Sequence, residues 1–304
     1  ENKFDIFKEL EFSGLLKKIG SNESINIESV KREKSYSNLI TIDQLTSFVS
    51  SVQENEWLSV DLETTSINPM VAEIVGFSFS IKKDTGVYVP IRFKDKKDNL
   101  FGDDDLQIAI DILKPILENP NIPKTGQNIK YDALIMKRYG INLDGIAFDT
   151  MIAAHLISPN SRSYKLDNLS ISHLNYKMVP IKDLIGSGKN QITMDQVTLE
   201  DISFYAAEDA DVVIELTEIF LKELKNQKLY NYFMAIEIDL LPVLINMQFN
   251  GIFVDKDYLA IRSDEIGIKI EALHNEITKL ADQDFNVNSS QQLAQILFDK
   301  LELP

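Results

Sequence analysis

Acidic side chains occur in this sequence at positions where folded proteins usually bury apolar ones. Asp61 and Glu63 lie two residues apart in the alternating segment 57–63, which predicts a β-strand. Because successive side chains of a strand point to opposite faces, we expect both carboxylates on the same face. An isolated Asp-x-Glu is common at the end of a strand, so the pair gains meaning only from further carboxylates.

Two more carboxylates interrupt the apolar faces of predicted helices. Residues 198–225 predict a helix that opens with a capping-box pattern, and Asp209 lies inside its apolar stripe. Asp132 shares the face of another predicted helix with Ile129. An ionised carboxylate on a buried face costs several kcal/mol unless it is paired or binds a metal. Each of these aspartates alone would suggest a local salt bridge or cap, but together they suggest a site.

The donor types indicate which metal such a site would hold. The chain has no cysteine, and its three histidines lie far apart in the sequence. Oxygen ligands without sulfur or imidazole favour Mg²⁺ or Mn²⁺. Several carboxylates around two divalent ions are the usual apparatus for phosphoryl transfer by in-line displacement. The sequence therefore predicts a metal site built from Asp61, Glu63, Asp132 and Asp209.

The composition, taken alone, argues against a protein that binds nucleic acid. Thirty-one basic and 47 acidic residues give a net charge of −16, whereas nucleic-acid binders are usually basic. Four of the negative charges are the predicted metal ligands, which explains part of the imbalance. Six basic residues in or between the acidic segments are expected to form a modest phosphate-facing surface: Lys130, Lys137, Arg138, Arg162, Lys165 and Lys189. No stretch approaches about 18 consecutive apolar residues, so no membrane-spanning segment is predicted.

The elements that must position these residues follow an α/β pattern. Strands are predicted over 39–42, 57–63, 74–81 and 87–91, with short extended pieces near 122–125 and 145–148. Helices are predicted over 43–52 and 198–225, and the chain is mostly helical from about residue 104. This order predicts a mixed β-sheet flanked by helices. Long helical periodicity over 229–249, 256–281 and 290–300 follows, so we place a domain boundary near residue 226.

Three segments together resemble the exonuclease motifs of the DEDD superfamily, in its tyrosine-containing branch. They are Asp61-Leu62-Glu63, the run 128–132 and the run 205–209. The longer runs 126–132, 146–151 and 188–191 resemble the proofreading domain of the bacterial family A DNA polymerases. The resemblance covers about 36–226 and implies a ribonuclease H-like fold, 3′-5′ exonuclease activity and two divalent cations, Mg²⁺ or Mn²⁺, as cofactors.

The resemblance also implies a role for each matching residue. Asp61, Glu63, Asp132 and Asp209 correspond to the four metal-binding carboxylates of the family. Tyr205 corresponds to the tyrosine that, together with Glu63, orients the attacking water. Its position supports this independently, because a spacing of four on one helix places its hydroxyl beside Asp209.

Three further positions match the family's contacts with the substrate. Gln127 and Asn128 correspond to contacts with the 3′-terminal nucleotide, and Ile67 to an apolar side chain wedged against the terminal base. The expected substrate is the single-stranded 3′ end of DNA, from which deoxynucleoside 5′-monophosphates are removed.

The remaining segments resemble the flanking parts of a longer polymerase. Residues 1–35 resemble the tail of a 5′-nuclease domain and a linker, with an amphipathic helix over 4–19. Residues 227–304 resemble the start of a polymerase domain and its thumb helices, without palm and fingers. The resemblance implies that the remainder of a DNA polymerase is a partner, and that the parent protein is cytoplasmic and nucleoid-associated in a bacterium.

Two other functions are open at this point. One is an RNA-trimming exonuclease of the same superfamily, against which the polymerase-like segment after residue 226 argues. The other is a catalytically silent module that positions DNA, as occurs where exonuclease carboxylates are lost. All four carboxylates are present in this sequence, which argues against a silent module.

Overall fold

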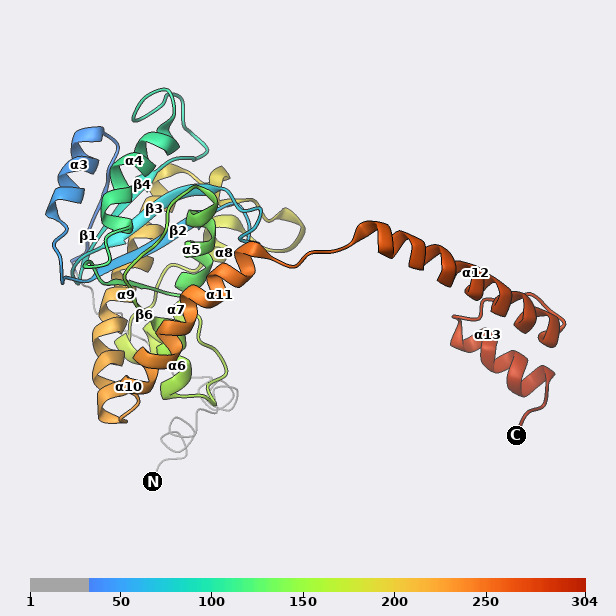
Figure 1. The fold of residues 1–304 in the computed structure, drawn as a ribbon. Coiled ribbons are helices and arrows are strands. Elements are labelled where there is room, and N and C mark those ends of the chain that lie inside the picture. The colour runs from blue at the N-terminus through green and yellow to red at the C-terminus, as the bar shows by residue number, and fades with distance from the viewer. Residues whose placement is uncertain (1–32) are drawn as a thin grey trace, which may run out of the picture. The chain divides into compact units, whose positions relative to one another are not determined.

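The computed structural model describes residues 33–304, so the helix expected over 4–19 and most of the expected linker lie outside the described residues. Six strands form one mixed sheet in the order β1-β4-β3-β2-β5-β6 (Figure 1). The strands are β1 Ser35–Asn38, β2 Leu58–Thr64, β3 Ile74–Ser80, β4 Thr85–Pro90, β5 Lys124–Gly126 and β6 Ile146–Asp149. β3 runs antiparallel to β2 and β4, whereas the other pairs are parallel. This confirms the predicted mixed sheet flanked by helices.

Helices connect these strands and follow them. In the part of the chain up to Asn250 they are α3 Ile42–Ser51, α4 Asp105–Leu117, α5 Ile129–Arg138, α6 Thr150–Ile157, α7 Leu166–Leu169, α8 Ile181–Ile185, α9 Leu199–Asn226, α10 Tyr230–Tyr232 and α11 Asp239–Asn250. Short π-helical or 3₁₀ turns lie at η1 Ser170–Leu174, η2 Gly188–Asn190, η3 Met194–Gln196 and η4 Phe233–Ile238. The predicted helix over 198–225 matches α9 closely, because the Thr198 side chain caps its first turn as the sequence pattern predicts.

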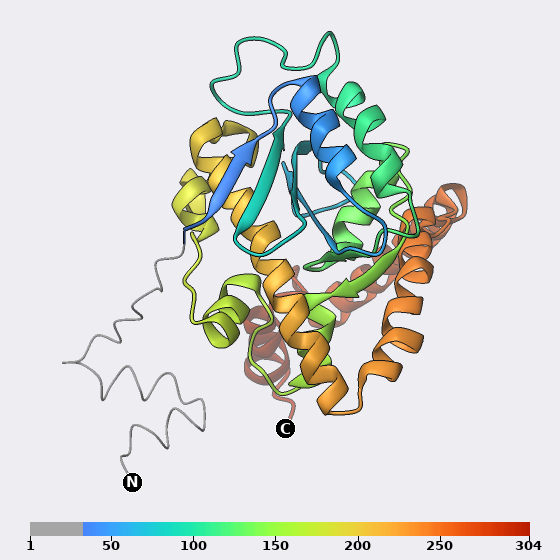
Figure 2. The same cartoon turned by 90° about the vertical axis from the view of Figure 1, so that its left-hand side faces the viewer.

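The two faces of the sheet differ in the size of their side chains. One face of the central strands carries bulky residues such as Val60, Phe77 and Phe79, and α3 packs there through a ring contact between Phe48 and Phe79. The opposite face carries small or polar residues, and α9 lies along it across β1 to β5 (Figures 1 and 2).

Small residues bring α9 unusually close to the sheet. A Cβ atom at Gly86 of β4 would lie 2.5 Å from the carbonyl oxygen of Ala207, which is closer than real Cβ atoms approach. Ala206, Ala207 and Ala210 of α9 are all fully buried against this face. The side chains of α9 therefore lie within reach of the polar side chains on β2.

The first strand and helix begin differently from the prediction. The apolar run 39–42 predicts a strand, but β1 occupies Ser35–Asn38 and α3 begins at Ile42. The reason is local hydrogen bonding: Thr41 accepts from the backbone of Gln44, whose side chain accepts from the backbone of Thr41. This capping box starts the helix before the apolar run can extend as a strand.

The first compact unit continues past the predicted boundary near residue 226 and ends at Asn250. Leu241 and Ile245 of α11 are buried in the main core, and α11 packs on α5. Among the described residues, one helical stretch, Tyr230–Asn250, has the length and apolar composition of a helix that could cross a membrane, which core helices of soluble proteins also have.

Residues Gly251–Pro304 form a second unit. It consists of α12 Lys256–Ala281, α13 Ser290–Ala294 and the π-helical turn η5 Gln295–Lys300, as the sequence periodicity predicts. Its small core contains Ala281, Phe285 and Ile296. Most of α12 is exposed, including apolar side chains such as Ile268.

Candidate active site

The acidic pair lies at the end of the central strand β2. Asp61 faces Ser78 of β3 across the sheet, and the Ser78 hydroxyl donates to the Asp61 carboxylate at 3.3 Å. Glu63 faces Gly76, and the register then shifts between Glu63 and Thr64. Such a bulge re-aims the chain after the second carboxylate. The prediction that both side chains share a face is thereby met by the register of the strand.

Helix α9 supplies the third carboxylate and the tyrosine. One carboxylate oxygen from each of Asp61, Glu63 and Asp209 can be chosen so that all lie within 4.8 Å of one another. Tyr205 lies one turn before Asp209, close enough that each side chain affects the pKa of the other. The close approach of α9 to the sheet is what brings a helix residue this near to two strand residues.

Helix α5 supplies the fourth carboxylate, Asp132. Asp132 lies outside the 4.8 Å group and is almost fully buried; burial, and then the charge of Asp61, raises its pKa well above the ordinary value. Asp149 fixes the start of this helix, because its carboxylate accepts from the backbone amide of Ile129 at 2.8 Å and also caps α6. Asn128, the residue before α5, is left-handed with φ 57°. Asp149 was part of the matching run 146–151 but had no predicted role.

The negative charges of the four carboxylates are not balanced by nearby basic side chains in the described part of the chain. Burial raises the pKa of Asp61 to about 6, against an ordinary value of 3.8. Burial and then the neighbouring carboxylates raise the pKa values of Glu63, Asp132 and Asp209 well above their ordinary range. Among residues 33–304, no lysine or arginine forms an ion pair with any of the four. A group of acids that repel one another and lack a basic partner fits divalent cations, which would supply the missing positive charge.

The carboxylates open into a cavity of about 770 Å³. Asp61, Glu63, Tyr205 and Asp209 line it, together with side chains from the loop after β2 and from the segment 181–194. Of the three residues predicted to contact substrate, two line this cavity. Ile67 and Asn128 line the cavity, and Ile67 is 96% exposed.

Gln127, the remaining predicted substrate contact, is not among the residues that line the cavity. Its side-chain amide donates to the carbonyl of Tyr164 at 2.8 Å and accepts from the hydroxyl of Thr150 at 2.6 Å. In this arrangement both ends of the amide are engaged by the protein. Gln127 therefore holds the segment at Tyr164 against the end of β5.

The loop that presents Ile67 is held by two side chains of α5. The Tyr131 hydroxyl donates to the carbonyl of Ser66 and lies 2.6 Å from the hydroxyl oxygen of Thr64. Seven residues further along the helix, Arg138 donates to the carbonyl of Pro69 at 3.0 Å and to that of Ala72. Arg138 was predicted to face phosphate, but its guanidinium group is used in this contact with the loop. Lys130 and Lys137 of the same set donate to side chains of α11 instead.

A second acidic cluster lies further along α9, and sequence reasoning missed it. Asp84, Asp211 and Glu215 also have carboxylate oxygens within 4.8 Å of one another. Lys34 lies among them, 2.5 Å from Asp211, 3.1 Å from Asp84 and 3.4 Å from Glu215. Tyr36 donates to Asp211 at 2.8 Å. The only signal in the sequence was helical spacing, because Asp211 and Glu215 are one turn apart.

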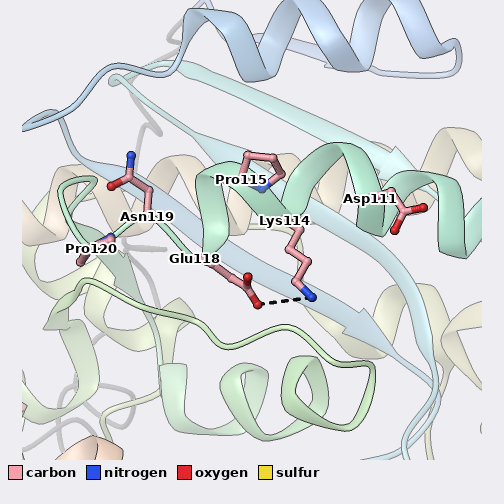
Figure 3. A pocket seen from close by; sticks show the side chains of 6 residues that line it. All are labelled: Asp111, Lys114, Pro115, Glu118, Asn119 and Pro120. Atoms are coloured by element: carbon pink, nitrogen blue, oxygen red, sulfur yellow. Dashed lines mark ion pairs between the residues drawn. The ribbon is translucent and has the colours of Figure 1, made fainter.

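Another hollow, of about 480 Å³, lies at the C-terminal end of α4 (Figure 3). Lys114 and Glu118 point toward each other across it and form an ion pair at 3.7 Å. Lys114 also donates to the carbonyl of Gly140. Asp111 at its edge accepts from the side-chain amide of Gln107, and the hollow contains no cluster of carboxylates, so we assign it no function.

This combination of fold and site has a counterpart among known families. The sequence model of a family described as a 3′-5′ exonuclease, from the A-type DNA polymerases, matches residues 36–225. The chain therefore belongs to the 3′-5′ exonuclease family of A-type DNA polymerases, and it carries a nuclease enzyme domain of that family.

Similar curated proteins carry the name DNA polymerase I. The chain is 33% identical to the protein of Pseudomonas aeruginosa over 98% of its own length and 34% of that protein. It is 36% identical to the protein of Borreliella burgdorferi, over 92% of this chain and 29% of the relative. The chain thus spans about a third of the length of the curated relatives that it matches.

Solved structures show the same fold at lower identity. The polymerase domain of Pol1 from M. smegmatis, in complex with DNA primer-template and dNTP, matches with a TM-score of 0.65 at 20% identity, over 88% of this chain and 41% of that one. Brucella melitensis NrnC matches with a TM-score of 0.55 at 16% identity, over 72% of this chain and 95% of that one. Both likenesses concern the fold.

Proposed function

We propose that this chain hydrolyses DNA from single-stranded 3′ ends with the help of two divalent cations, releasing deoxynucleoside 5′-monophosphates. The observation that carries the proposal is the carboxylate group at the cavity. Three carboxylates from two elements lie within 4.8 Å of one another, beside a tyrosine hydroxyl and without a basic partner in residues 33–304. Such a site would bind cations and, through them, a phosphodiester.

The residues divide into ligands and orienting groups. Asp61, Glu63 and Asp209 would hold one Mg²⁺ or Mn²⁺, and Asp61 with Asp132 would hold the second. Bound divalent ions would neutralise charge on the scissile phosphate and lower the pKa of water. Tyr205 remains protonated, since burial and the neighbouring Asp209 raise its pKa. Its hydroxyl can therefore orient the attacking water throughout the physiological pH range.

The cavity has room for the last nucleotide of a strand. Its volume of about 770 Å³ falls in the range of small-molecule sites. Ile67 presents an exposed apolar side chain at the mouth, where it can pack on a base, and Asn128 offers an amide at the start of α5. Gln127 is proposed to support this wall through its bonds to Tyr164 and Thr150.

The wider setting is proposed from the relatives. We infer that residues 1–35 are the tail of a 5′-nuclease domain and a linker, that 36–226 form the exonuclease domain, and that 227–304 begin a polymerase domain. The parent would then be a DNA polymerase of the bacterial cytoplasm, associated with the nucleoid, in which the exonuclease proofreads. The structure of the first unit adds that the helix ending at Asn250 packs on the exonuclease domain.

The test is digestion of matched 5′-labelled single strands of DNA and RNA with Mg²⁺, with and without a chelator. A ladder that shortens from the 3′ end of DNA, and stops with chelator, supports the proposal. Faster digestion of RNA would assign the RNA-trimming alternative. No digestion of either strand in Mg²⁺ or Mn²⁺ would assign the silent DNA-positioning alternative.

A further inference from the structure

Tyr88 of β4 is a buried side chain whose hydroxyl has no partner. The residue is 0% exposed, and its hydroxyl oxygen makes no hydrogen bond within the described part of the chain. Leaving a buried polar group unpaired costs about 1–3 kcal/mol. A phenylalanine would fill the same space without this cost, so the hydroxyl calls for an explanation.

The strand register places Tyr88 on the face that carries the acidic pair. Tyr88 pairs with Ser78 of β3, and Ser78 pairs in turn with Asp61 of β2. Residues that pair across neighbouring strands point to the same face of a sheet. Tyr88 therefore shares its face with Asp61 and, two residues further along β2, with Glu63.

Gly76 lets the ring reach across to Glu63. A Cβ atom at Gly76 would lie 2.3 Å from the Tyr88 hydroxyl oxygen and 2.4 Å from its Cζ, so the ring occupies the space of the missing side chain. Gly76 is the residue that pairs with Glu63. The hydroxyl thus leaves its own row of the sheet and ends in the row of Glu63. After burial, the charge of Glu63 is the next largest cause that raises the pKa of Tyr88, which agrees with this direction.

Glu63 is the ligand that lacks what Tyr88 offers. The Ser78 hydroxyl donates to Asp61 at 3.3 Å, while Tyr205 lowers the pKa of Asp209 and nearby backbone amides lower the pKa of Asp132; no group lowers the pKa of Glu63 in this way. Within residues 33–304, no donor bonds the Glu63 carboxylate. One buried donor without an acceptor therefore lies beside one buried carboxylate without a donor.

We propose that Tyr88 is a positioning residue for Glu63. Its hydroxyl donates to the Glu63 carboxylate when that carboxylate is ionised and turned toward a divalent cation, and so fixes the orientation of this ligand. Partners of this kind behind metal ligands typically contribute about 10- to 100-fold in metal affinity or activity. The inference rests on the proposed metal-dependent function.

The variant Tyr88→Phe tests this because a structural and a positioning role predict different results. The metal-free protein should unfold at the same temperature or higher, since an unpaired buried hydroxyl is removed. Affinity for Mn²⁺, measured by calorimetric titration without DNA, should fall about 10-fold. Cleavage should need correspondingly more Mn²⁺ for half-maximal rate and recover near the wild-type rate at saturating Mn²⁺. In a Glu63→Gln background the same change should have no further effect on Mn²⁺ affinity.

Tyr36→Phe is a matched control, because that hydroxyl already has a partner in Asp211. It should lower the stability of the protein and leave Mn²⁺ affinity unchanged. Unchanged Mn²⁺ affinity in Tyr88→Phe, at any stability, would overturn the proposal, and so would an equal loss in both variants. Failure of the proposed function itself would look different, since the wild-type protein would then neither bind Mn²⁺ nor cleave DNA.

Discussion

Two acidic clusters lie along the same helix and differ in what neutralises them. Asp209 of α9 joins Asp61 and Glu63, and in each cluster three carboxylates have oxygens within 4.8 Å of one another. In the second cluster, built on Asp211, the ammonium group of Lys34 lies among the carboxylates. The first cluster has no such group within residues 33–304 and lines an open cavity.

The comparison shows that a group of buried acids is not by itself a metal site. Lys34 balances part of the charge of the second cluster from within and joins the start of β1 and the turn before β4 to α9. Without a basic residue, the first cluster keeps raised pKa values and stays available to cations. The first cluster should therefore matter for activity and the second for stability.

The largest expected effect is on activity at the first cluster. Asp61→Ala combined with Glu63→Ala should abolish nuclease activity, because two ligands are lost together. The metal-free fold should remain intact and at least as stable as the wild type, since two like charges that repel each other are removed. Digestion of a labelled single strand and thermal unfolding measure both effects. Wild-type trimming by the double variant would contradict the assignment of the site.

The second cluster should respond in the opposite way. Asp211→Ala removes the partner of both Lys34 and Tyr36. Breaking a buried ion pair from one side typically costs about 3–5 kcal/mol, and the remaining Asp84 and Glu215 should hold the loss near the lower end. Denaturant unfolding measures it. At a temperature where the variant is folded, its rate of DNA cleavage should stay within a few-fold of wild type. A complete loss of cleavage at that temperature would show that the second cluster, like the first, is needed for activity.

Tyr205→Phe separates chemistry from packing within the first cluster. The change keeps the ring and all four carboxylates and removes one hydrogen bond that acts on the attacking water. The expected loss is about 10²-fold in kcat, with little change in binding. Single-turnover cleavage at saturating enzyme and Mg²⁺, with a binding titration in Ca²⁺, distinguishes the two. A large loss of binding with unchanged cleavage would move Tyr205 to substrate positioning.

The pH dependence of the metal-free protein should reveal the first cluster. The folded-state pKa of Asp61 is raised to about 6 from an ordinary 3.8, so between these values the native state binds more protons than the unfolded state. Its contribution to stability is present below about pH 4 and is lost as pH rises through about 6. Affinity for Mn²⁺ should rise over the same range, because protons must leave. Asp61→Asn should flatten the pH dependence of both stability and Mn²⁺ affinity. Unfolding experiments and Mn²⁺ titrations from pH 4 to 7.5 measure this, and an unchanged pH dependence in the variant would contradict the prediction.

The smallest effect is expected at the edge of the second cluster. Lys83 lies 3.0 Å from Glu215, but its side chain is 49% exposed. Ion pairs at such positions contribute about 0–1 kcal/mol. Lys83→Gln should therefore change the free energy of unfolding by less than about 0.5 kcal/mol. A loss as large as that of Asp211→Ala would show that the cluster depends on its exposed cation as well as on Lys34.

The sequence predicted the strand and helices of the site better than the contacts that surround them. Periodicity located the strand of Asp61 and the helix of Asp209, because alternation and helical spacing are local properties. Helical spacing likewise located Asp132, and the resemblance supplied the role of Tyr205 and the family. Lys34 could not be placed, since its partners lie up to 181 residues away. Tyr88 looked like an ordinary strand residue, because only the register and the absence of a side chain at Gly76 give its hydroxyl a direction.

Helix α9 contributes residues to both clusters from one continuous helix, which restricts how this segment can vary in length. Each added or deleted residue turns the rest of an α-helix by about 100°. An insertion between Tyr205 and Glu215 would therefore rotate Tyr205, Asp209, Asp211 and Glu215 out of their present alignment with the sheet, and the close contact at Gly86 leaves no slack to absorb the turn. Homologues should accordingly differ in this interval by substitution alone, and insertions and deletions should be confined to the loops on either side of α9.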